Sequence, residues 1–225
     1  MTDENTDFLY PMVDGTQQDA STLLEDLARS AAHKAERSAQ LTMATLEATG
    51  AQLDGIATAL DERFAAGGRL FTCGNGGSAT DAEGVAAMFW SPPADAELTE
   101  VRSLPARSLV ADVSVLTALS NDIGFDVVYS RQVIAHARDG DIVMGFSTSG
   151  NSVNVIKAFE EGHRRGLLTI GFAGNDGGAM ARCAELDHCL VVRADSVHRI
   201  QEAQSAAAHE LWRRVQRRLT GRQAA

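Results

Sequence analysis

The sequence predicts an α/β protein in which helices cover both faces of a parallel sheet. Two observations carry this prediction. Beyond about residue 67, at least four short apolar runs of strand length alternate with helical stretches, as in a parallel sheet. The chain has 225 residues, 44% hydrophobic and 22% charged, which suits the core of one soluble globular domain. The sequence contains no visible internal repeat and no second domain.

The region before the predicted sheet contains an arm and then helices. Residues 1–20 are acidic and poor in apolar side chains, which predicts a loose arm. A helical pattern starts at Ser21, and a second one covers 39–66, with Gly50 or Gly55 as a weak point. The apolar positions expected in the second stretch are Leu41, Met43, Leu46, Leu53, Ile56, Leu60 and Phe64. Two alternatives stay open for these helices, which pack either on another subunit or on their own sheet.

A glycine-rich loop follows the first predicted strand, which covers 68–73. Three glycines surround Asn75 in residues 74–78, and glycine permits positive φ and a close approach of a ligand to the backbone. Ser78 is expected to cap a helix over 79–90. Because the loop lacks both the G-x-G-x-x-G spacing and the P-loop lysine, its residues argue against NAD and ATP.

The alternation of strands and helices continues to the C-terminus. The pattern predicts an irregular stretch (91–105), a strand (107–110), a helix (112–119), a polar turn (120–124), a helix (125–137) and a strand (142–146). It then predicts a helix (153–165), a strand (167–172), a short helix (177–183), a strand (186–192) and a last helix (196–218). With 220–225 as a tail, the single domain is expected to span 21–219.

A second polar loop, Ser147–Ser152, joins a predicted strand to a predicted helix. Its hydroxyl and amide side chains surround Gly150 at a helix N-terminus, where free N–H groups and the helix dipole favour an anion. The alternative is that these residues only cap the helix. The loop has no lysine or arginine, so a phosphate would be held by hydrogen bonds. Both polar loops follow strand C-termini and can converge on one pocket.

One face of the last predicted helix is polar. His198, Gln201, Ser205 and His209 recur at spacings of three, four and four. Histidine carries protons near neutral pH, which makes His209 a candidate for function. Residues expected to pack elsewhere on this helix are Ile200, Ala203, Ala207, Leu211 and Val215, and those expected on a solvated face are Glu202, Gln204 and Glu210.

The charge and the cysteine content indicate which partners and which cellular compartment suit the protein. The formal net charge of −10 disfavours nucleic acid, and the C-terminal arginines (213, 214, 217, 218 and 222) suit the negative end of a helix. The odd count of three cysteines predicts free thiols in a reducing compartment. No apolar run approaches the ~18 residues of a membrane span, and the acidic N-terminus does not resemble a signal peptide. We therefore expect a cytoplasmic protein without a membrane partner.

Four motifs in this order resemble the sugar-isomerase (SIS) domain family, in its phosphoheptose isomerase subgroup. They are Gly74–Ser78, Ser120–Asp122, Ser147–Ser152 and Arg199–Glu202, and the resemblance covers about residues 20–219. It implies a three-layer α/β/α sandwich with a five-stranded parallel sheet, preceded by N-terminal helices. It also implies a homotetramer, with sites at subunit interfaces, that interconverts sedoheptulose 7-phosphate and a heptose 7-phosphate.

The resemblance also implies site residues. The implied substrate-binding residues come from three loops and are Asn75, Gly76, Gly77, Ser78, Asn121, Asp122, Ser147, Thr148, Ser149 and Ser152. The last four would hold the phosphate, the first four would line the sugar site, and the middle pair would reach sugar hydroxyls. Gln201 and His209 match a family glutamine and histidine that can also bind zinc. In the family the histidine is the base that moves a proton between C1 and C2 through an enediol.

The chain departs from the family on the helix that follows the glycine-rich loop. Counting from Asp81, the family has a metal-binding histidine three residues on and a catalytic, metal-binding glutamate four residues after that. This sequence has Gly84 and Met88 at those positions. A zinc site reduced to Gln201 and His209 has too few ligands, so we expect no metal cofactor.

The same departure removes the general acid and leaves more than one function open. In the first hypothesis, the chain is an isomerase with His209 as base and an acid from Asp122, Glu83, His198 or a neighbouring subunit. In the second, it is a sugar-phosphate-binding or protein-assembly module, like one family member that has lost catalytic residues. A third possibility is a different sugar phosphate, since the irregular stretch 91–105 lies near the pocket rim in this fold.

Overall fold

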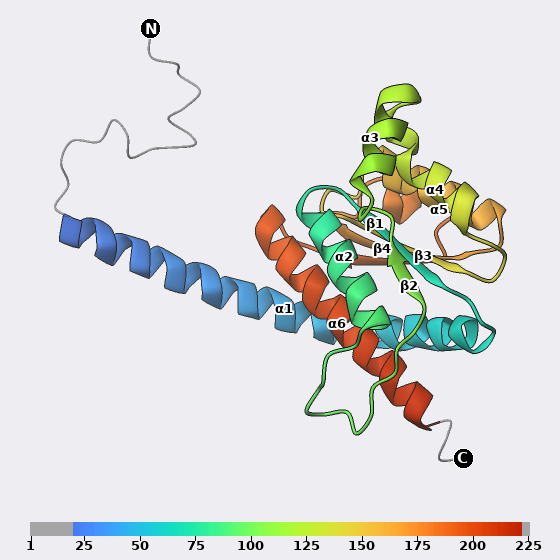
Figure 1. The fold of residues 1–225 in the computed structure, drawn as a ribbon. Helices are drawn as coiled ribbons and strands as arrows, with labels where there is room; N and C mark the ends of the chain where they lie inside the picture. The colour runs from blue at the N-terminus through green and yellow to red at the C-terminus, as the bar shows by residue number, and fades with distance from the viewer. Residues whose placement is uncertain (1–19, 222–225) are drawn as a thin grey trace, which may run out of the picture. The chain divides into compact units, whose positions relative to one another are not determined.

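A computed structural model describes residues 20–221 of the chain (Figure 1). Five parallel strands form one sheet in the order β2-β1-β3-β4-β5. The strands are β1 (Leu70–Gly74), β2 (Ala106–Ser108), β3 (Ile142–Ser147), β4 (Leu168–Gly174) and β5 (His188–Val192). The expected five-stranded parallel sheet is confirmed.

Helices separate the strands along the chain. They are α1 (Ala20–Ala65), α2 (Gly77–Trp90), α3 (Val113–Asp122), α4 (Val128–His136), α5 (Val153–Arg164) and α6 (Val197–Gly221). Two short 3₁₀ helices, η1 (Phe125–Val127) and η2 (Met180–Arg182), complete the set found in residues 20–221. Within those residues, no helix is both long enough and apolar enough to cross a membrane.

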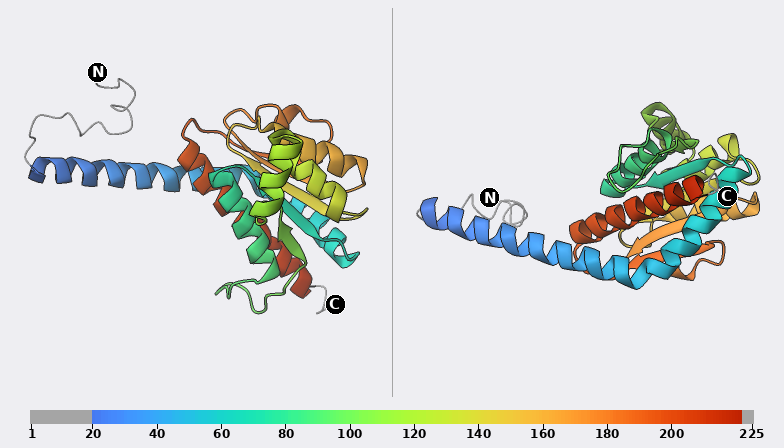
Figure 2. Two further views of the ribbon diagram at one scale, coloured as in Figure 1. Left: turned by 45° about the horizontal axis from the view of Figure 1, so that its top comes forward. Right: turned by 90° about the horizontal axis from the view of Figure 1, so that it is seen from below.

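Two hydrophobic clusters lie on opposite faces of the sheet. Neighbouring residues of a strand point to opposite faces, and Leu70 joins one cluster while Phe71 joins the other. The first cluster contains residues of α2, of α6 and of α1 beyond Gln40; the second contains residues of α4 and α5. Figure 2 shows the sheet between these groups of helices from two further directions. The predicted three-layer sandwich is therefore confirmed.

A buried carboxylate joins β1 to the start of β3. Asp141 is completely buried and accepts hydrogen bonds from the Arg69 backbone N–H at 2.8 Å and from its Nη2 at 2.7 Å. It also accepts the backbone N–H of Arg138 at 2.9 Å. With its oxygens satisfied in this way, the charge is tolerated in the interior and aligns the two strands whose far ends carry the polar loops.

The chain divides into two compact units after Gln40, and α1 runs through the boundary. In the first unit, described from Ala20, Leu24 and Leu27 are 65% and 48% exposed. In the second unit, Leu53 and Leu60 are completely buried in the core on their own sheet. The alternative in which the second helical stretch covers its own sheet is therefore confirmed.

Two expectations for the N-terminal region are wrong. The two predicted helices are one helix of 46 residues, because the backbone stays helical through both Gly50 and Gly55. Met43 is 71% exposed, since the buried stripe lies on another side of the helix. The predicted arm (1–20) and tail (220–225) lie outside the described residues except at their inner ends, and the domain division stays a prediction.

Three local expectations also need correction. Helix α2 starts at Gly77 with Gly76 at its N-cap position, so Ser78 lies inside the helix and does not cap it. The predicted polar turn at 120–122 is the last turn of α3, because Asp112 caps that helix and its backbone bonds continue to Ile123. The short helix predicted over 177–183 is reduced to η2, since the glycines before it have positive φ.

Candidate functional site

The two polar loops meet at the C-terminal edge of the sheet. Strands β1 and β3 pair directly, with Gly74 opposite Phe146, so the loops that follow them are neighbours. Two reciprocal amide bonds join the loops: Asn75 Nδ2 donates to Asn154 Oδ1 at 2.8 Å, and Asn154 Nδ2 donates to Asn75 Oδ1 at 2.9 Å. The glycine-rich loop is thereby connected to the first turn of α5.

A buried tyrosine supports this connection from α4. The Tyr129 hydroxyl donates to the carbonyl oxygen of Gly74 and lies 3.3 Å from Asn75 Oδ1. Burial raises the pKa of Tyr129, and the nearby Cys73 thiol adds to the rise, so the phenol stays neutral and can donate. Sequence reasoning missed both Tyr129 and Asn154. For Asn154 a signal existed, since it is a polar residue in the first turn of the helix after a hydroxyl-rich loop.

The hydroxyls of the second loop form a cluster of their own. Ser147 is buried, and its Oγ lies 2.8 Å from the Oγ of Ser152 and 3.5 Å from the Oγ of Ser149. Ser152 is at the N-cap position of α5, but its side chain makes no capping hydrogen bond. The capping alternative is therefore wrong for Ser152. The hydroxyls and the positive end of the helix dipole remain together at one point, which suits an anion.

Backbone contacts with the turn after β4 hold the hydroxyl loop in place. The carbonyl oxygen of Gly150 accepts the N–H of Met180 at 2.9 Å, and Asn151 Oδ1 accepts the N–H of Ala179 at 2.9 Å. Gly150 has φ +65°, and a Cβ at this position would lie 2.1 Å from the carbonyl oxygen of Gly177. Only glycine fits there, which explains the glycine inside an otherwise hydroxyl-rich loop.

Helices α2 and α6 lie side by side and run in the same direction, as Figures 1 and 2 show. Two contacts fix their register. A Cβ at Gly77 would lie 2.3 Å from Gln201 Nε2, so the amide of Gln201 lies directly against the glycine-rich loop. One turn further along both helices, the Ser205 hydroxyl donates to Asp81 Oδ1. We call this line of contacts the α2/α6 seam.

Continued by one more turn, the seam reaches Gly84 on α2 and His209 on α6, and Met88 lies one turn beyond Gly84. Gly84 is exposed, and a Cβ there would have nothing within 4 Å. Met88 is half-buried and packs on the core. His209 is exposed, with its ring centroid 5.4 Å from that of Trp212. The two positions that lack the family's polar groups therefore belong to the same seam as the candidate base.

The residues of the seam do not fit a zinc ion. A protein zinc site uses three or four His, Cys, Asp or Glu ligands, and Gly84 and Met88 offer none. In residues 20–221 no group of three or more such side chains is placed to hold a metal.

Asp81 is a polar residue of the seam that sequence reasoning used only as a reference point. Burial raises the pKa of its carboxyl group, and the hydrogen bond from Ser205 lowers it, with burial the larger effect. Its Oδ2 is buried and has no hydrogen-bond partner among the described residues. The carboxyl group therefore holds a proton more readily than an ordinary aspartate.

The other expected site residues lie partly on α3 and partly in the two loops themselves. Asn121 and Asp122 are exposed on the last turn of α3, and Asn121 Nδ2 donates to Asp122 Oδ1 at 2.8 Å. Within the described part of the chain, no hydrogen bond joins this pair to either loop. Thr148 is half-buried in the hydroxyl loop itself. Gly76 precedes α2 with φ +56°, a conformation that suits glycine.

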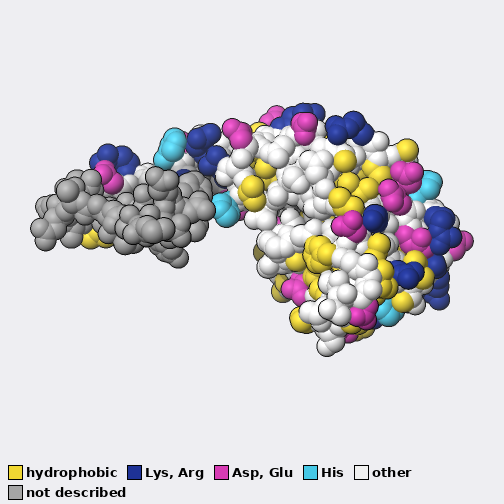
Figure 3. Space-filling model, turned by 90° about the horizontal axis from the view of Figure 1, so that it is seen from above, with side chains coloured by type: hydrophobic (Ala, Val, Ile, Leu, Met, Phe, Trp, Pro, Cys, Tyr) yellow, Lys and Arg dark blue, Asp and Glu magenta, His cyan; other side chains and the backbone are white. Residues whose placement is uncertain are grey.

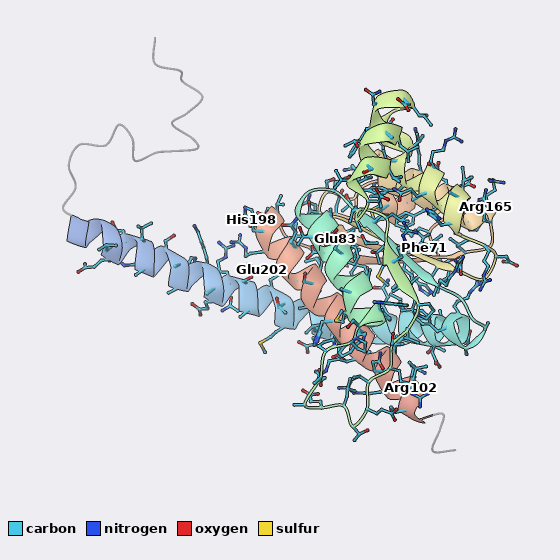
Figure 4. The ribbon with its side chains drawn as sticks, in the orientation of Figure 1. Phe71, Glu83, Arg102, Arg165, His198 and Glu202 are labelled. Carbon is cyan, nitrogen blue, oxygen red and sulfur yellow. The ribbon has the colours of Figure 1, made fainter. Side chains whose placement is uncertain are left out.

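The predicted polar face of α6 is present, and the prediction is wrong for one residue of the helix. His198, Ser205 and His209 are exposed and Gln201 is half-buried, while the apolar positions expected to pack are buried. Gln204, expected on the solvated face, is completely buried because it lies one turn from both Ile200 and Ala208 on the packed side. Figure 4 shows His198 and Glu202 on the first turns of α6 and Glu83 on α2.

The C-terminal arginines are largely neutralised. Arg213 pairs with Asp95, Glu97 and Glu210, and Arg214 pairs with Asp54 and Glu210. These ion pairs support the expectation that nucleic acid is not the partner of this cluster. Figure 3 shows another face, seen from above, on which acidic and basic side chains are interspersed.

The three cysteines are free, as expected. Burial raises the pKa of Cys73 to about 12 and that of Cys189 to about 11, so both thiols stay protonated.

Comparisons with known proteins identify the family. A family model described as "SIS domain" matches residues 28–174. The phosphoheptose isomerase of Roseiflexus sp. (strain RS-1) is 41% identical over 184 residues, covering 82% of this chain and 90% of that protein. The phosphoheptose isomerase of Desulfovibrio desulfuricans is 49% identical over 149 residues, covering 66% and 68%. The structure of phosphoheptose isomerase GmhA from Neisseria gonorrhoeae matches with TM-score 0.75 and 36% identity, covering 84% of this chain and 97% of that one. With its parallel sheet and its two joined polar loops, the chain thus belongs to the SIS domain family and is similar to the family's phosphoheptose isomerases.

Proposed function

We propose that the protein is a sugar-phosphate isomerase of the phosphoheptose type, which interconverts sedoheptulose 7-phosphate and an aldose 7-phosphate. One observation carries the proposal: the hydroxyl cluster at the N-terminus of α5 is tied through Asn154 and Asn75 to the loop against which Gln201 lies. A phosphate site and a polar seam with a histidine therefore adjoin. The 41% identity to a named phosphoheptose isomerase over most of both chains supports the same substrate class.

In the proposed complex, the phosphate lies at Ser147, Thr148, Ser149 and Ser152. The sugar chain extends past Asn75 and the backbone of Gly76, Gly77 and Ser78 toward α6, with Asn121 and Asp122 toward its hydroxyls. Phosphate binding by hydroxyls and helix N–H groups holds the chain at one end. This places the C1–C2 end toward Gln201 and His209.

His209 is the proposed base. In the ketose-to-aldose direction it takes a proton from C1, and the carbonyl oxygen at C2 gains a proton as the enediol forms. The hydroxyl at C1 then loses its proton, and His209 returns the first proton to C2. Gln201 donates from its amide to an oxygen of the enediol and so stabilises the charge that develops there.

The proton that moves between the two oxygens requires an acid, which the chain does not have at Met88. A well-placed acid contributes typically ~10²–10⁴ in rate, so turnover should be slow unless another group supplies it. The proposed sources are Asp122, Glu83, His198 or a residue of a neighbouring subunit. We propose further that turnover requires no zinc, because the donor set that remains is too small.

The proposed assembly is a homotetramer in the cytoplasm. Large apolar side chains at Met43, Trp90 and Phe125, which are 71%, 61% and 55% exposed, support burial against further copies of the chain. Three free thiols suit a reducing compartment. Light scattering of the purified full chain tests the assembly, and a monomer at micromolar concentration would contradict it.

The function itself is tested by proton exchange at C1 and C2. Full-length protein is incubated with sedoheptulose 7-phosphate in D₂O, with and without added zinc, and deuterium incorporation is followed by NMR. Exchange is expected in both conditions, and His209→Asn should abolish it. Binding without exchange would favour the alternative of a sugar-phosphate-binding or assembly module. The absence of polar groups at Gly84 and Met88 would then explain the lack of turnover. Exchange that survives His209→Asn would show that another residue is the base.

A further inference from the structure

Asn154 is a buried amide in the first turn of α5, where both ends of its side chain bond the glycine-rich loop. Its Nδ2 donates to Asn75 Oδ1 at 2.9 Å, and its Oδ1 accepts from Asn75 Nδ2 at 2.8 Å. The same Oδ1 accepts the backbone N–H of Val155 at 3.0 Å. Because a backbone N–H can only donate, this third bond determines which end of the Asn154 amide carries the oxygen. The direction of both bonds to Asn75 follows from it.

These bonds turn the Asn75 side chain toward the protein. Asn75 Oδ1 has two polar neighbours, the Asn154 amide at 2.9 Å and the Tyr129 hydroxyl at 3.3 Å. Since a carbonyl oxygen has two lone pairs, this arrangement leaves it little accepting capacity for a ligand. Both neighbours are buried residues of helices, so they hold Asn75 in a fixed place. A ligand therefore meets this loop mainly through the backbone that follows Asn75.

The position of Asn75 determines the course of that backbone. Its carbonyl oxygen accepts the N–H of Ser78 at 3.0 Å, which turns the chain into α2. Gly76, inside this turn, has φ +56°, and the next residue, Gly77, lies directly against the amide of Gln201. A displacement of Asn75 therefore moves the part of the loop that lies nearest to Gln201.

The hydroxyl loop does not depend on Asn154 in the same way. Its Gly150 and Asn151 accept backbone N–H groups of the turn after β4, and these contacts remain when the Asn154 side chain is removed. Asn154 thus fastens one loop from the helix whose N-terminus carries the other. Its side chain determines the spacing of the two loops.

We propose that Asn154 is a positioning residue, which holds the glycine-rich loop at a fixed spacing from the hydroxyl loop and so aligns the two halves of the site. Its effect on the loop does not depend on the proposed function, and its effect on turnover rests on that function. A sugar phosphate held at Ser147–Ser152 then meets the backbone of Gly76 and Gly77 in one geometry. A misplacement of about 1 Å can cost about 100-fold in rate, so this alignment affects the reaction.

Amide hydrogen exchange of the ligand-free, full-length protein tests the position of the loop. In Asn154→Ala the N–H of Ser78 should exchange roughly tenfold faster or more, because the loop loses two hydrogen bonds. The N–H of Met180, which bonds the hydroxyl loop, should keep its rate. The control is Gln216→Ala, which removes another buried amide that bonds the backbone of Arg102 in both directions and should leave both rates unchanged. An unchanged Ser78 rate in Asn154→Ala, or equal acceleration at Ser78 and Met180, would overturn the proposal.

Binding and kinetics test the consequence for the reaction. Asn154→Ala should lower kcat/KM for sedoheptulose 7-phosphate by roughly 10- to 100-fold, while the Kd for inorganic phosphate stays within about twofold. In a protein that already carries Asn75→Ala, the same change should cause no further loss, because its partner is gone. Additive losses, or an equal loss of phosphate affinity, would contradict a positioning role. Faster Ser78 exchange in Asn154→Ala, with a wild type that does not turn over the sugar phosphate, would retain the positioning of the loop and refute only the proposed function.

Discussion

The hydroxyl loop and the α2/α6 seam differ in how completely they are built. In the loop, Ser147 is buried, its hydroxyl bonds another hydroxyl, and neighbouring backbone groups hold Gly150 and Asn151 on the turn after β4. In the seam, by contrast, Gly84 faces open space. Among the described residues, one side-chain hydrogen bond joins α6 to α2, from Ser205 to Asp81.

This difference separates binding from chemistry. A phosphate needs several hydrogen-bond donors at one point, and a rigid loop on a helix N-terminus provides them. Proton transfer needs individual groups at defined places, and a single replacement removes one of them. We therefore propose that the protein combines an anion site at residues 147–152 with a seam in which Gly84 and Met88 offer no group for proton transfer.

Restoring the missing groups should have the largest effect. The double variant Gly84→His, Met88→Glu restores the two polar side chains of the family pattern, with the imidazole entering open space, and offers four ligands together with Gln201 and His209. We expect exchange of sedoheptulose 7-phosphate to rise by roughly 10²–10⁴ and to become zinc-dependent. Steady-state kinetics with and without a chelator measures both effects. The isosteric variant Gly84→Asn, Met88→Gln is the control, and an equal gain there would contradict the explanation.

The second-largest effect is expected from removing hydroxyls of the 147–152 loop, which should weaken binding of the sugar phosphate. Ser147→Ala with Ser149→Ala deletes two groups that we assign to the phosphate, and hydrogen bonds to charged groups are worth about 1.5–3 kcal/mol each. Affinity for the sugar phosphate should fall by roughly 100-fold or more, as measured by calorimetry. Ser114→Ala, on the exposed side of α3, should leave affinity unchanged. Unchanged affinity in the double variant would refute the phosphate assignment.

Displacing Gln201 should have an intermediate effect. Gly77→Ala puts a methyl group 2.3 Å from Gln201 Nε2, and the flexible side chain must move away. We expect kcat/KM to fall by about tenfold, since small displacements in a site are costly, with little change in the melting temperature. Gly84→Ala is the control on the same helix, where the added methyl group meets nothing. Equal kinetics for the two variants would exclude Gln201 from the site.

The smallest effect is expected at Asp81. Its folded-state pKa is raised by burial, against the bond from Ser205, so protonation is favoured by folding. Stability from this group is present below the ordinary aspartate pKa and is lost as pH rises through the raised value. Asp81→Asn should therefore melt higher than the wild type near pH 7.5 and by a smaller margin near pH 4. A constant difference across that range, measured by calorimetry, would contradict the shifted pKa.

Several side chains of the site come from segments with no local signal. Tyr129 supports the glycine-rich loop from 55 positions away along the chain, and Asp95 reaches α6 from an irregular loop. Gln204 was expected in solvent and is buried, because one polar residue on a helix does not reveal which side packs. Ser78 was expected as a cap, but a glycine occupies the N-cap position and the serine points inward.

The sequence by itself determined the alternation of strands and helices and the two polar loops at strand ends. Strand length, helical period and glycine or hydroxyl clusters are local properties, and a parallel sheet brings the loops to one edge. It also determined that Gly84 and Met88 carry no polar group. Only the tertiary structure decided which groups meet: the register of α2 on α6, the Asn75–Asn154 bonds, and Asp95 on Arg213. Those contacts join residues far apart in the chain, and their formation depends on packing of the whole core.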